Sequence, residues 1–283
     1  MLRRSQPPRR HRPRRRRPPG PVVRGAYVRG GAALLIAAVA LAAVLAPVVA
    51  PYGPAAGDLH ARLLPPGSPG HLLGTDGQGR DLLSRVVWGA RVSLAGGALP
   101  VLTALVLGTA LGVPAGLGGR RLENLIMRVL DVLYAFPAVL LAMAVASALG
   151  PGFAGTAVSL SVVLTPAVAR VALTEVRRIR SADYLEAARA SGAGRLAVAT
   201  RQVLPVVLPV VLTYCTALVG LAIVYAAGLS FFGLGVAPPT AEWGSMLNEL
   251  RPYAFSAPGV AVVPAIVIFV VSLAFTALGR TTR

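Results

Sequence analysis

Long stretches without a charged residue constrain this chain more than any other feature. Four of them cover residues 92–119, 132–169, 202–241 and 252–279, with lengths of 28, 38, 40 and 28 residues. A further apolar run covers residues 32–50. A helix needs about 20 mostly apolar residues to cross a bilayer, and backbone groups in lipid must be paired within their own segment. The stretches therefore predict an all-α, polytopic membrane protein.

Breaks inside the two longest stretches set the number of spans. Gly150-Pro151-Gly152 predicts a tight hairpin that divides the second stretch into two helices. The third stretch becomes rich in glycine and proline after Gly228, which predicts one span followed by an irregular loop. We expect one transmembrane domain over residues 29–283, with six helices at about 32–50, 95–117, 133–149, 153–172, 206–227 and 259–278.

The arginines predict how the helices are oriented. The chain has 28 arginines and no lysine, and the first 29 residues hold 11 of the arginines. With the N-terminus inside, 23 arginines fall in cytoplasmic segments and five in outer ones, as the positive-inside rule requires. We expect both termini to lie in the cytoplasm, with the chain in the plasma membrane. Residues 1–28, rich in arginine and proline, are expected to form a disordered tail that touches anionic lipid rather than a specific nucleic acid.

The composition excludes several classes of enzyme. A phosphate-binding Walker loop needs its lysine, and so does Schiff-base chemistry. One cysteine and three widely separated histidines cannot build a cysteine-rich zinc site. The spans carry almost no ionisable residue, and we expect Asp131 to pair with Arg128 at the inner face. We therefore expect no catalytic residue, no cofactor and no metal in this chain.

The loop at residues 175–205 is the longest predicted cytoplasmic segment. Its pattern predicts a short helix over 184–190, a break at glycine, and a second helical stretch over 195–204. The expected helix caps are Ser181 and Asp183, the breaking residues are Gly192 and Gly194, and Pro205 opens the next span. Such an element either docks into a groove on a soluble partner or serves as a solvated connector, and both interpretations stay open.

At this loop the sequence resembles the permeases of bacterial ATP-binding-cassette importers. The resemblance lies in a Glu-Ala-Ala run, a glycine four residues later and a downstream Leu-Pro pair. The matching positions are Tyr184, Glu186, Ala187, Ala188, Gly192, Leu204 and Pro205. In that family this loop is the coupling helix that enters the cleft of the ATPase subunit.

Two further segments resemble the second permease subunit of dipeptide, oligopeptide and nickel importers. The first is the predicted outer loop, with Gly74, Thr75, Asp76, Gly79, Arg80, Asp81, Ser84 and Arg85. The second begins at Leu229 and contains Phe231, Phe232, Gly233, Gly235, Pro238 and Trp243. Arg128, Asp131 and Phe136-Pro137 also fit, and the resemblance covers roughly residues 28–280.

The residues themselves leave the roles of these segments open. Residues 80–94 have one apolar face, which predicts an interfacial helix at the outer surface with Asp81 at its N-terminus and paired to Arg85. This helix either supports the fold of the outer surface, as a scaffold, or contacts the substrate. Irregular backbone at residues 229–240 is tolerated at membrane depth only against protein or water, so it lines a translocation mouth or forms a plain surface loop.

The resemblance implies a type I importer fold and a role as a permease subunit. Its implied partners are a second permease subunit in a heterodimer, two cytoplasmic ATPase subunits and an extracytoplasmic substrate-binding protein. The implied cargo is a dipeptide or oligopeptide, with nickel or another small solute as the alternative. A secondary carrier and a polybasic membrane anchor are the other classes left open.

Overall fold

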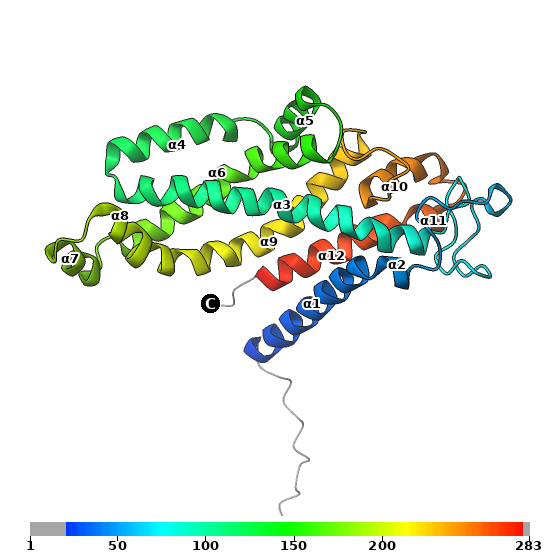
Figure 1. Ribbon diagram of the computed structural model, residues 1–283, viewed down its shortest axis with the longest axis horizontal. Coiled ribbons are helices and arrows are strands. Elements are labelled where there is room, and N and C mark those ends of the chain that lie inside the picture. The colour runs from blue at the N-terminus through cyan, green and yellow to red at the C-terminus, as the bar shows by residue number, and fades with distance from the viewer. Residues whose placement is uncertain (1–20, 280–283) are drawn as a thin grey trace, which may run out of the picture.

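The computed structural model describes residues 21–279, and these are mostly helical, apart from a long loop over residues 50–81 (Figure 1). The long helices are α1 (Pro21–Val44), α3 (Leu82–Leu117), α6 (Phe153–Ile179), α9 (Leu204–Phe231) and α12 (Val263–Gly279). The shorter helices are α2 (Ala46–Val49), α4 (Arg120–Tyr134), α5 (Ala138–Leu149), α7 (Asp183–Ala190), α8 (Arg195–Ala197), α10 (Trp243–Leu250) and α11 (Pro258–Ala261). Short 3-10 turns occupy Leu59–Ala61 and Arg251–Tyr253, and a π-helical segment occupies Val198–Val203. The all-α prediction is confirmed, since the described residues form only isolated β-bridges.

Five segments are long and apolar enough to cross a membrane. They are Tyr27–Val44, Leu82–Leu117, Phe153–Ile179, Arg195–Phe231 and Pro258–Gly279. The predicted number of six is reached only if α4 and α5, which meet at a bend of 86°, count as one span. Figure 1 shows α3, α6 and α9 along the long axis, with α7 and α8 at one end and α10 and α11 at the other. We call these the α7 end and the α10 end.

The closest helix pair, α3 and α6, depends on glycine. Gly108, Gly112 and Gly116 repeat every four residues and form one stripe of α3. A Cβ at Gly112 would lie 2.4 Å from the carbonyl oxygen of Ala169 on α6. Such stripes of small residues let transmembrane helices approach backbone to backbone, where van der Waals contact drives association. The glycines therefore position α6, which forms one wall of the pocket described below.

Helix α3 differs from the sequence prediction at its start. We predicted an interfacial helix over 80–94 and a separate span over 95–117, but one helix of 36 residues covers both. At 1.5 Å per residue this helix is about 54 Å long. The Gly96-Gly97 pair at the predicted boundary does not interrupt the helix, and Pro100 and Pro114 also lie within it, as transmembrane helices tolerate.

The third predicted span, 133–149, is wrong as a straight helix. The structure places its start inside α4, and only the 12 residues of α5 follow the break. Pro137 explains the bend, because proline disfavours helical backbone at Phe136 and offers no N–H of its own. The predicted hairpin at Gly150-Pro151-Gly152 is confirmed, since α5 ends at Leu149 and α6 begins at Phe153.

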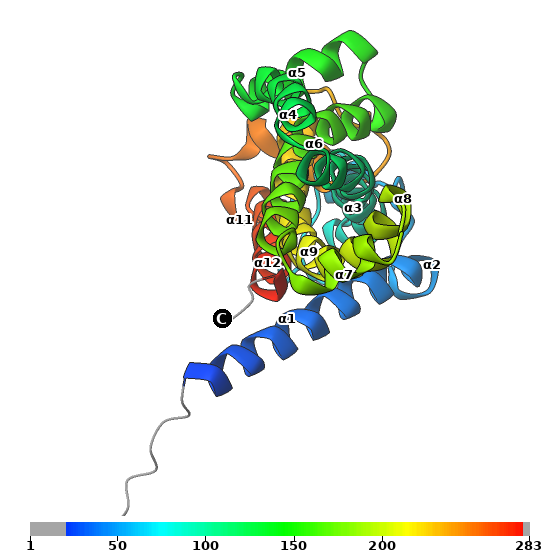
Figure 2. The same cartoon turned by 90° about the vertical axis from the view of Figure 1, so that its left-hand side faces the viewer.

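The first helix begins earlier than we predicted. Residues 21–28, assigned to the tail from the sequence, belong to α1, which starts at Pro21. Proline suits a first helical turn, where its missing N–H would have no partner. The rest of the predicted tail, residues 1–20, lies outside the described residues. Figure 2 shows α1 leaving the bundle obliquely.

Two groups of buried apolar side chains hold the bundle together. One joins α3, α6 and α9 along their length and includes Leu164, Val168 and Val207. The other lies toward the α10 end and includes Leu82, Ile223 and Trp243. Helix α9 contributes to both groups, so it connects the two ends of the molecule.

Candidate functional site

The loop between α6 and α9 forms the α7 end of the molecule. Helix α7 ends in two backbone hydrogen bonds, from Gly192 N to Arg189 O (3.0 Å) and from Ala193 N to Ala188 O (3.0 Å). These bonds define a Schellman motif. Gly192 has a φ of +82°, in the left-handed region that side chains with a Cβ rarely adopt. Gly192 therefore sets the angle between α7 and the next helical segment.

One side chain attaches α7 to the bundle. Leu185 is fully buried and packs in the same apolar group as Val198 and Val203. Its neighbours Tyr184, Glu186 and Ala187 are exposed, and Leu196 on α8 is 78% exposed. The loop thus presents a mixed apolar and charged surface, on which Arg189 and Arg195 are also exposed, and Leu185 holds the helix in place.

The rest of the loop leads directly into α9. Helix α8 and the π-helical segment replace the predicted second helix of residues 195–204. Leu204 and Pro205 form the first turn of α9, where proline removes no hydrogen bond. The predicted capping by Ser181 and Asp183 is wrong, because Ala182 occupies the cap position of α7 without a side-chain bond and Asp183 is the first helical residue.

The loop before α3 lies at the α10 end. Two of its glycines adopt backbone conformations that residues with a Cβ rarely adopt. Gly74 and Gly79 have φ values of +79° and +72°. A Cβ at Gly79 would lie 1.7 Å from the carbonyl oxygen of Asp58. Thr75 is buried, accepts a hydrogen bond from Leu64 N (2.9 Å) and donates one to Ala61 O. This loop is folded tightly on itself.

Four charged side chains join this loop to α10. Asp76 Oδ2 accepts from Arg80 Nε (2.6 Å) and from Arg85 Nη1 (2.5 Å). Glu249 Oε2 on α10 accepts from Arg80 Nη2 (2.6 Å) and from Arg85 Nη1 (2.5 Å). Asp76 and both arginines are buried. The sequence analysis did not identify Glu249, although acidic residues are rare in this chain and each one is a candidate partner for an arginine.

Burial raises the pKa of Asp76, but its hydrogen bonds and neighbouring charges outweigh this effect. The backbone N–H groups of Arg80 (3.0 Å) and Gln78 (2.8 Å) donate to Asp76 Oδ1. Together with the guanidinium groups of Arg80 and Arg85, they hold the pKa of Asp76 below its usual value. Asp76 is therefore a fixed negative charge that organises the loop.

Asp81 has a different partner from the one we predicted. Its predicted position at the helix N-terminus is confirmed, because Asp81 Oδ2 accepts from Ser84 N (2.7 Å) and Ser84 Oγ (2.7 Å). The predicted pair with Arg85 is wrong, since Asp81 Oδ1 contacts His71 Nδ1 (2.9 Å). Arg85 turns instead toward Asp76 and α10. The burial of this loop favours the scaffold interpretation for its motif.

The segment after α9 divides into exposed and buried parts. Phe231 ends α9, and Phe232 is 61% exposed. Gly233 adopts a φ of +83°. Trp243, in contrast, is fully buried and its Nε1 donates to Val86 O on α3 (3.0 Å).

Tight packing and one capping carboxylate hold the remainder of this segment. A Cβ at Gly235 would lie 1.8 Å from Ser230 Oγ, and Pro238 precedes an exposed turn. Glu242, which we did not identify from the sequence, caps α10 by accepting from Gly244 N (2.8 Å) and Ser245 N (2.8 Å). Trp243 thus anchors the end of the segment, and the exposed residues 232–233 and 237–240 are free to contact another molecule.

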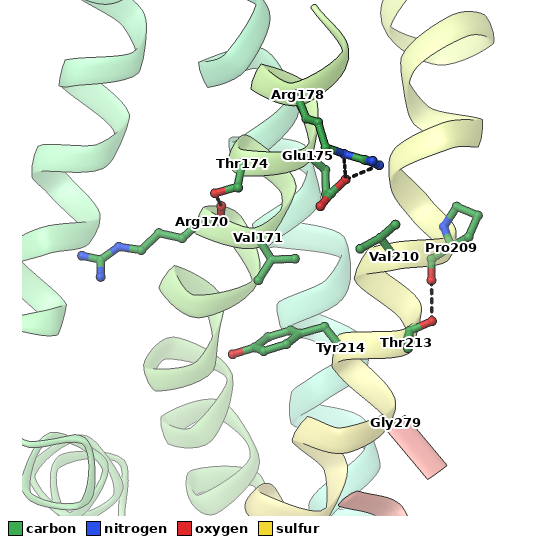
Figure 3. A pocket seen from close by; sticks show the side chains of 10 residues that line it. All are labelled: Arg170, Val171, Thr174, Glu175, Arg178, Pro209, Val210, Thr213, Tyr214 and Gly279. Carbon is green, nitrogen blue, oxygen red and sulfur yellow. Dashed lines mark hydrogen bonds and ion pairs between the residues drawn. The ribbon is translucent and has the colours of Figure 1, made fainter. Parts of the chain in front are cut away.

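A pocket of about 710 Å³ lies between α6 and α9 near the α7 end (Figure 3). Its α6 wall carries charged and hydroxyl side chains, and its α9 wall carries Pro209, Val210, Thr213 and Tyr214. Glu175 pairs with Arg178 at 2.7 Å beside it. The sequence analysis did not assign this pocket, because its walls come from helices about 40 residues apart in the chain.

Ion pairs tie α4 to the same part of α6. Asp131 Oδ1 accepts from Arg170 Nη2 at 2.5 Å, and Glu123 pairs with Arg177. The predicted pair between Asp131 and Arg128 is therefore wrong. The Arg170 guanidinium also lies 4.0 Å from the ring centroid of Tyr134. Both acidic residues of α4 pair with arginines of α6. The partner of Asp131 therefore depends on how α4 packs against α6, not on spacing along α4.

Comparisons with known proteins agree with this architecture. The family described as "Binding-protein-dependent transport system inner membrane component" matches residues 108–281. A glutathione transport system permease protein of Pectobacterium atrosepticum is 41% identical over 76% of this chain and 72% of its own length. A putative peptide transport system permease protein of Brucella suis is 40% identical over 88% of this chain and 84% of its own. A solved structure of the MetNI methionine ABC transporter in inward facing conformations covers 69% of this chain and 94% of its own, with 17% identity and a TM-score of 0.48.

Proposed function

We propose that this chain, which belongs to the family of binding-protein-dependent transport system inner membrane components, couples ATP hydrolysis in partner subunits to the import of short peptides. The role of permease subunit in an ABC importer follows from the family. The proposal concerns the cargo, the partners and the coupling element.

The observation that carries the coupling proposal is the conformation of the loop at residues 175–205. Helix α7 stands at one end of the molecule, is anchored by Leu185 and ends in a Schellman motif at Gly192. Its exposed side chains suit a groove that accepts a short amphipathic helix. A force applied to α7 passes to α6 at Ile179 and to α9 at Leu204, because α7 lies between these helices.

The α7 end faces the cytoplasm in this proposal. Arginines gather in α4, in the end of α6 and in the loop that contains α7, and cytoplasmic segments of membrane proteins carry such an excess. Two ATPase subunits would then meet α7 and the corresponding loop of a second permease subunit. An extracytoplasmic binding protein would deliver the cargo at the α10 end.

Peptides are the cargo class that the relatives favour. The names of the two relatives above refer to peptide transport and to glutathione transport, and glutathione is itself a tripeptide. Both relatives cover most of this chain at about 40% identity. We therefore propose short peptides ahead of nickel or another small solute.

The test begins with the intact complex. The tagged chain is purified gently from its native membrane, and co-purifying chains are identified by mass spectrometry. We expect two ATPase chains and a second permease chain. The complex is then reconstituted in liposomes with its binding protein, and uptake of labelled trialanine is measured with ATP, with a non-hydrolysable analogue and with a membrane potential alone.

Uptake that requires hydrolysable ATP supports the proposal. Uptake driven by the membrane potential without ATP would instead identify a secondary carrier. ATP-driven uptake of nickel with no uptake of trialanine or glutathione would overturn the proposed cargo but leave the coupling element intact.

A further inference from the structure

A second pocket shares the lining residue Tyr214 with the pocket shown in Figure 3. The second pocket has a volume of about 220 Å³ and lies deeper in the bundle, between α6, α9 and the bend that joins α4 to α5. Its walls are apolar or aromatic and include Tyr134, Phe136 and Tyr225. Tyr214 lines both pockets, so it lies where they meet.

One face of α9 lines both pockets. Val210 and Tyr214 belong to the first pocket, and Leu218, Leu221 and Tyr225 belong to the second, together with Tyr214. Steps of three and four residues place these side chains on the same side of a helix. From Val210 to Tyr225 the face is about 22 Å long at 1.5 Å per residue. This is more than half of the roughly 30 Å hydrocarbon core of a bilayer.

Partly exposed charges beside the first pocket exclude lipid as its occupant. Side chains of Arg170 and Asp131 are 42% and 56% exposed, and those of Arg178 and Glu175 are 63% and 12% exposed. Arg170 lies near the predicted cytoplasmic end of the span at residues 153–172. Charged groups at the end of a span face water or protein because exposure to hydrocarbon is costly.

The two pockets differ in size and in chemistry. The first has the volume of pockets that enclose a whole small molecule, about 300–1,000 Å³, and it carries the Glu175 carboxylate and the Arg178 guanidinium group. The second is smaller than that range and offers aromatic rings, three of which carry phenol groups. A short peptide has two charged termini and one side chain per residue, so it matches a charged pocket followed by an aromatic one.

We propose that this groove of α6 and α9 is the part of the cargo path that this chain contributes, filled with water from the α7 end as far as Tyr214. The charged pocket surrounds the backbone and termini of a peptide in transit. Tyr214 is the narrow point, and its phenol group contacts the cargo as a side chain enters the aromatic pocket. This inference rests on the proposed function and names the residues that meet its cargo.

Cysteine accessibility tests the water-filled part. The only native cysteine, Cys215, is buried, and it is replaced by alanine. If Cys215→Ala does not assemble, the native chain serves as the background instead, and the labelling rate of its Cys215 is subtracted. Thr213→Cys places a thiol in the charged pocket. Leu212→Cys is the matched control, because Leu212 is the adjacent residue, is 44% exposed and does not line either pocket.

The complete complex is placed in lipid nanodiscs and treated with a charged, membrane-impermeant methanethiosulfonate. We expect Thr213→Cys to react at least tenfold faster than Leu212→Cys. Equal rates at the two positions overturn the proposal. Reaction of Thr213→Cys with a lipid-soluble maleimide but not with the charged reagent also overturns it, because lipid would then fill the groove.

Protection by cargo tests the contact at Tyr214. Tyr214→Cys is labelled with and without trialanine while the complex turns over ATP. We expect trialanine to slow labelling several-fold, and we expect free alanine at the same concentration to have no effect. Labelling at an unchanged rate overturns the cargo contact.

Uptake measurements distinguish failure of this inference from failure of the proposed function. Trialanine uptake by the Cys215→Ala complex is measured in liposomes from the same preparation. Uptake without protection at Tyr214→Cys overturns the groove as cargo path and leaves the importer function standing. Absence of ATP-driven uptake in the unmodified complex overturns both.

Discussion

Arg170 of α6 and Asp131 of α4 form a 2.5 Å ion pair across 39 residues of sequence. Neighbours along the chain had suggested Arg128 as the partner of Asp131. The pair fixes α4 against α6 beside the charged pocket, and the Tyr134 ring lies against the same guanidinium group. A side-chain contact between two helices thus forms one edge of the groove.

Removing one side chain of this pair is expected to impair transport more than removing both. Arg170→Ala leaves the Asp131 carboxylate without its cation, and Asp131→Ala leaves the arginine without its anion. We expect each single variant to lower ATP-driven uptake, and the double variant Arg170→Ala/Asp131→Ala to recover part of the loss. A double-mutant cycle on the uptake rate measures the interaction. Additive effects in the double variant would mean that the two side chains act independently.

The conformation of Gly192 gives a second prediction. A Cβ would meet no other atom within 4 Å at either Gly192 or Gly194, but only Gly192 has a positive φ. Left-handed backbone costs residues with a Cβ about 1–2 kcal/mol. We expect Gly192→Ala to slow transport severalfold and Gly192→Val to abolish it, with ATPase subunits still bound.

Gly194→Ala is the matched control, since Gly194 has a φ of −66°. It should transport at the normal rate. ATPase activity and co-purification are measured for each variant in parallel. Full ATP-dependent uptake by a properly assembled Gly192→Val complex would show that the angle between α7 and α8 does not matter for coupling.

The glycine stripe of α3 gives a prediction about stability. A methyl group at Gly112 would lie 2.4 Å from Ala169 O, whereas one at Gly96 would lie 3.8 Å from the nearest side-chain atom. Overpacking typically costs about 1–3 kcal/mol. We expect Gly112→Ala to lower the thermal midpoint of the purified complex and Gly96→Ala to leave it nearly unchanged. Equal midpoints for the two variants would contradict the close packing of α3 and α6.

The lowered pKa of Asp76 predicts how the outer loop responds to acid. A carboxyl group with a folded-state pKa below its ordinary value of 3.8 stabilises the fold above that value and loses its contribution as the pH falls through the folded-state pKa. We expect the loop to remain ordered from pH 8 to about pH 5 and to loosen only below about pH 4.

Fluorescence of Trp243 reports this transition in a Trp88→Phe variant, because the chain has two tryptophans and Trp243 is buried beside the loop's helix. Asp76→Asn should be less stable at neutral pH and should lack the acid step. A transition between pH 7 and pH 5 that persists in Asp76→Asn would assign the response to another group.

The sequence by itself determined the helical character of the chain, the hairpin at Gly150–Gly152 and the break at Gly192. These features depend on local physics, since uncharged length predicts a span and glycine supplies backbone that other residues avoid. The resemblance in the loop and outer motifs pointed to the permease family, which the comparisons then showed.

Tertiary structure decided which distant side chains meet. Arg85 could have paired with Asp81 one turn away, but packing of α10 brings Glu249 to it from 164 residues along the chain. The same holds for Arg170 with Asp131, and for the groove whose walls come from α6 and α9. Spacing along one helix defines which residues share a face, whereas the partner of that face depends on how whole helices pack. The bend at Pro137 and the Gly112 contact set that packing.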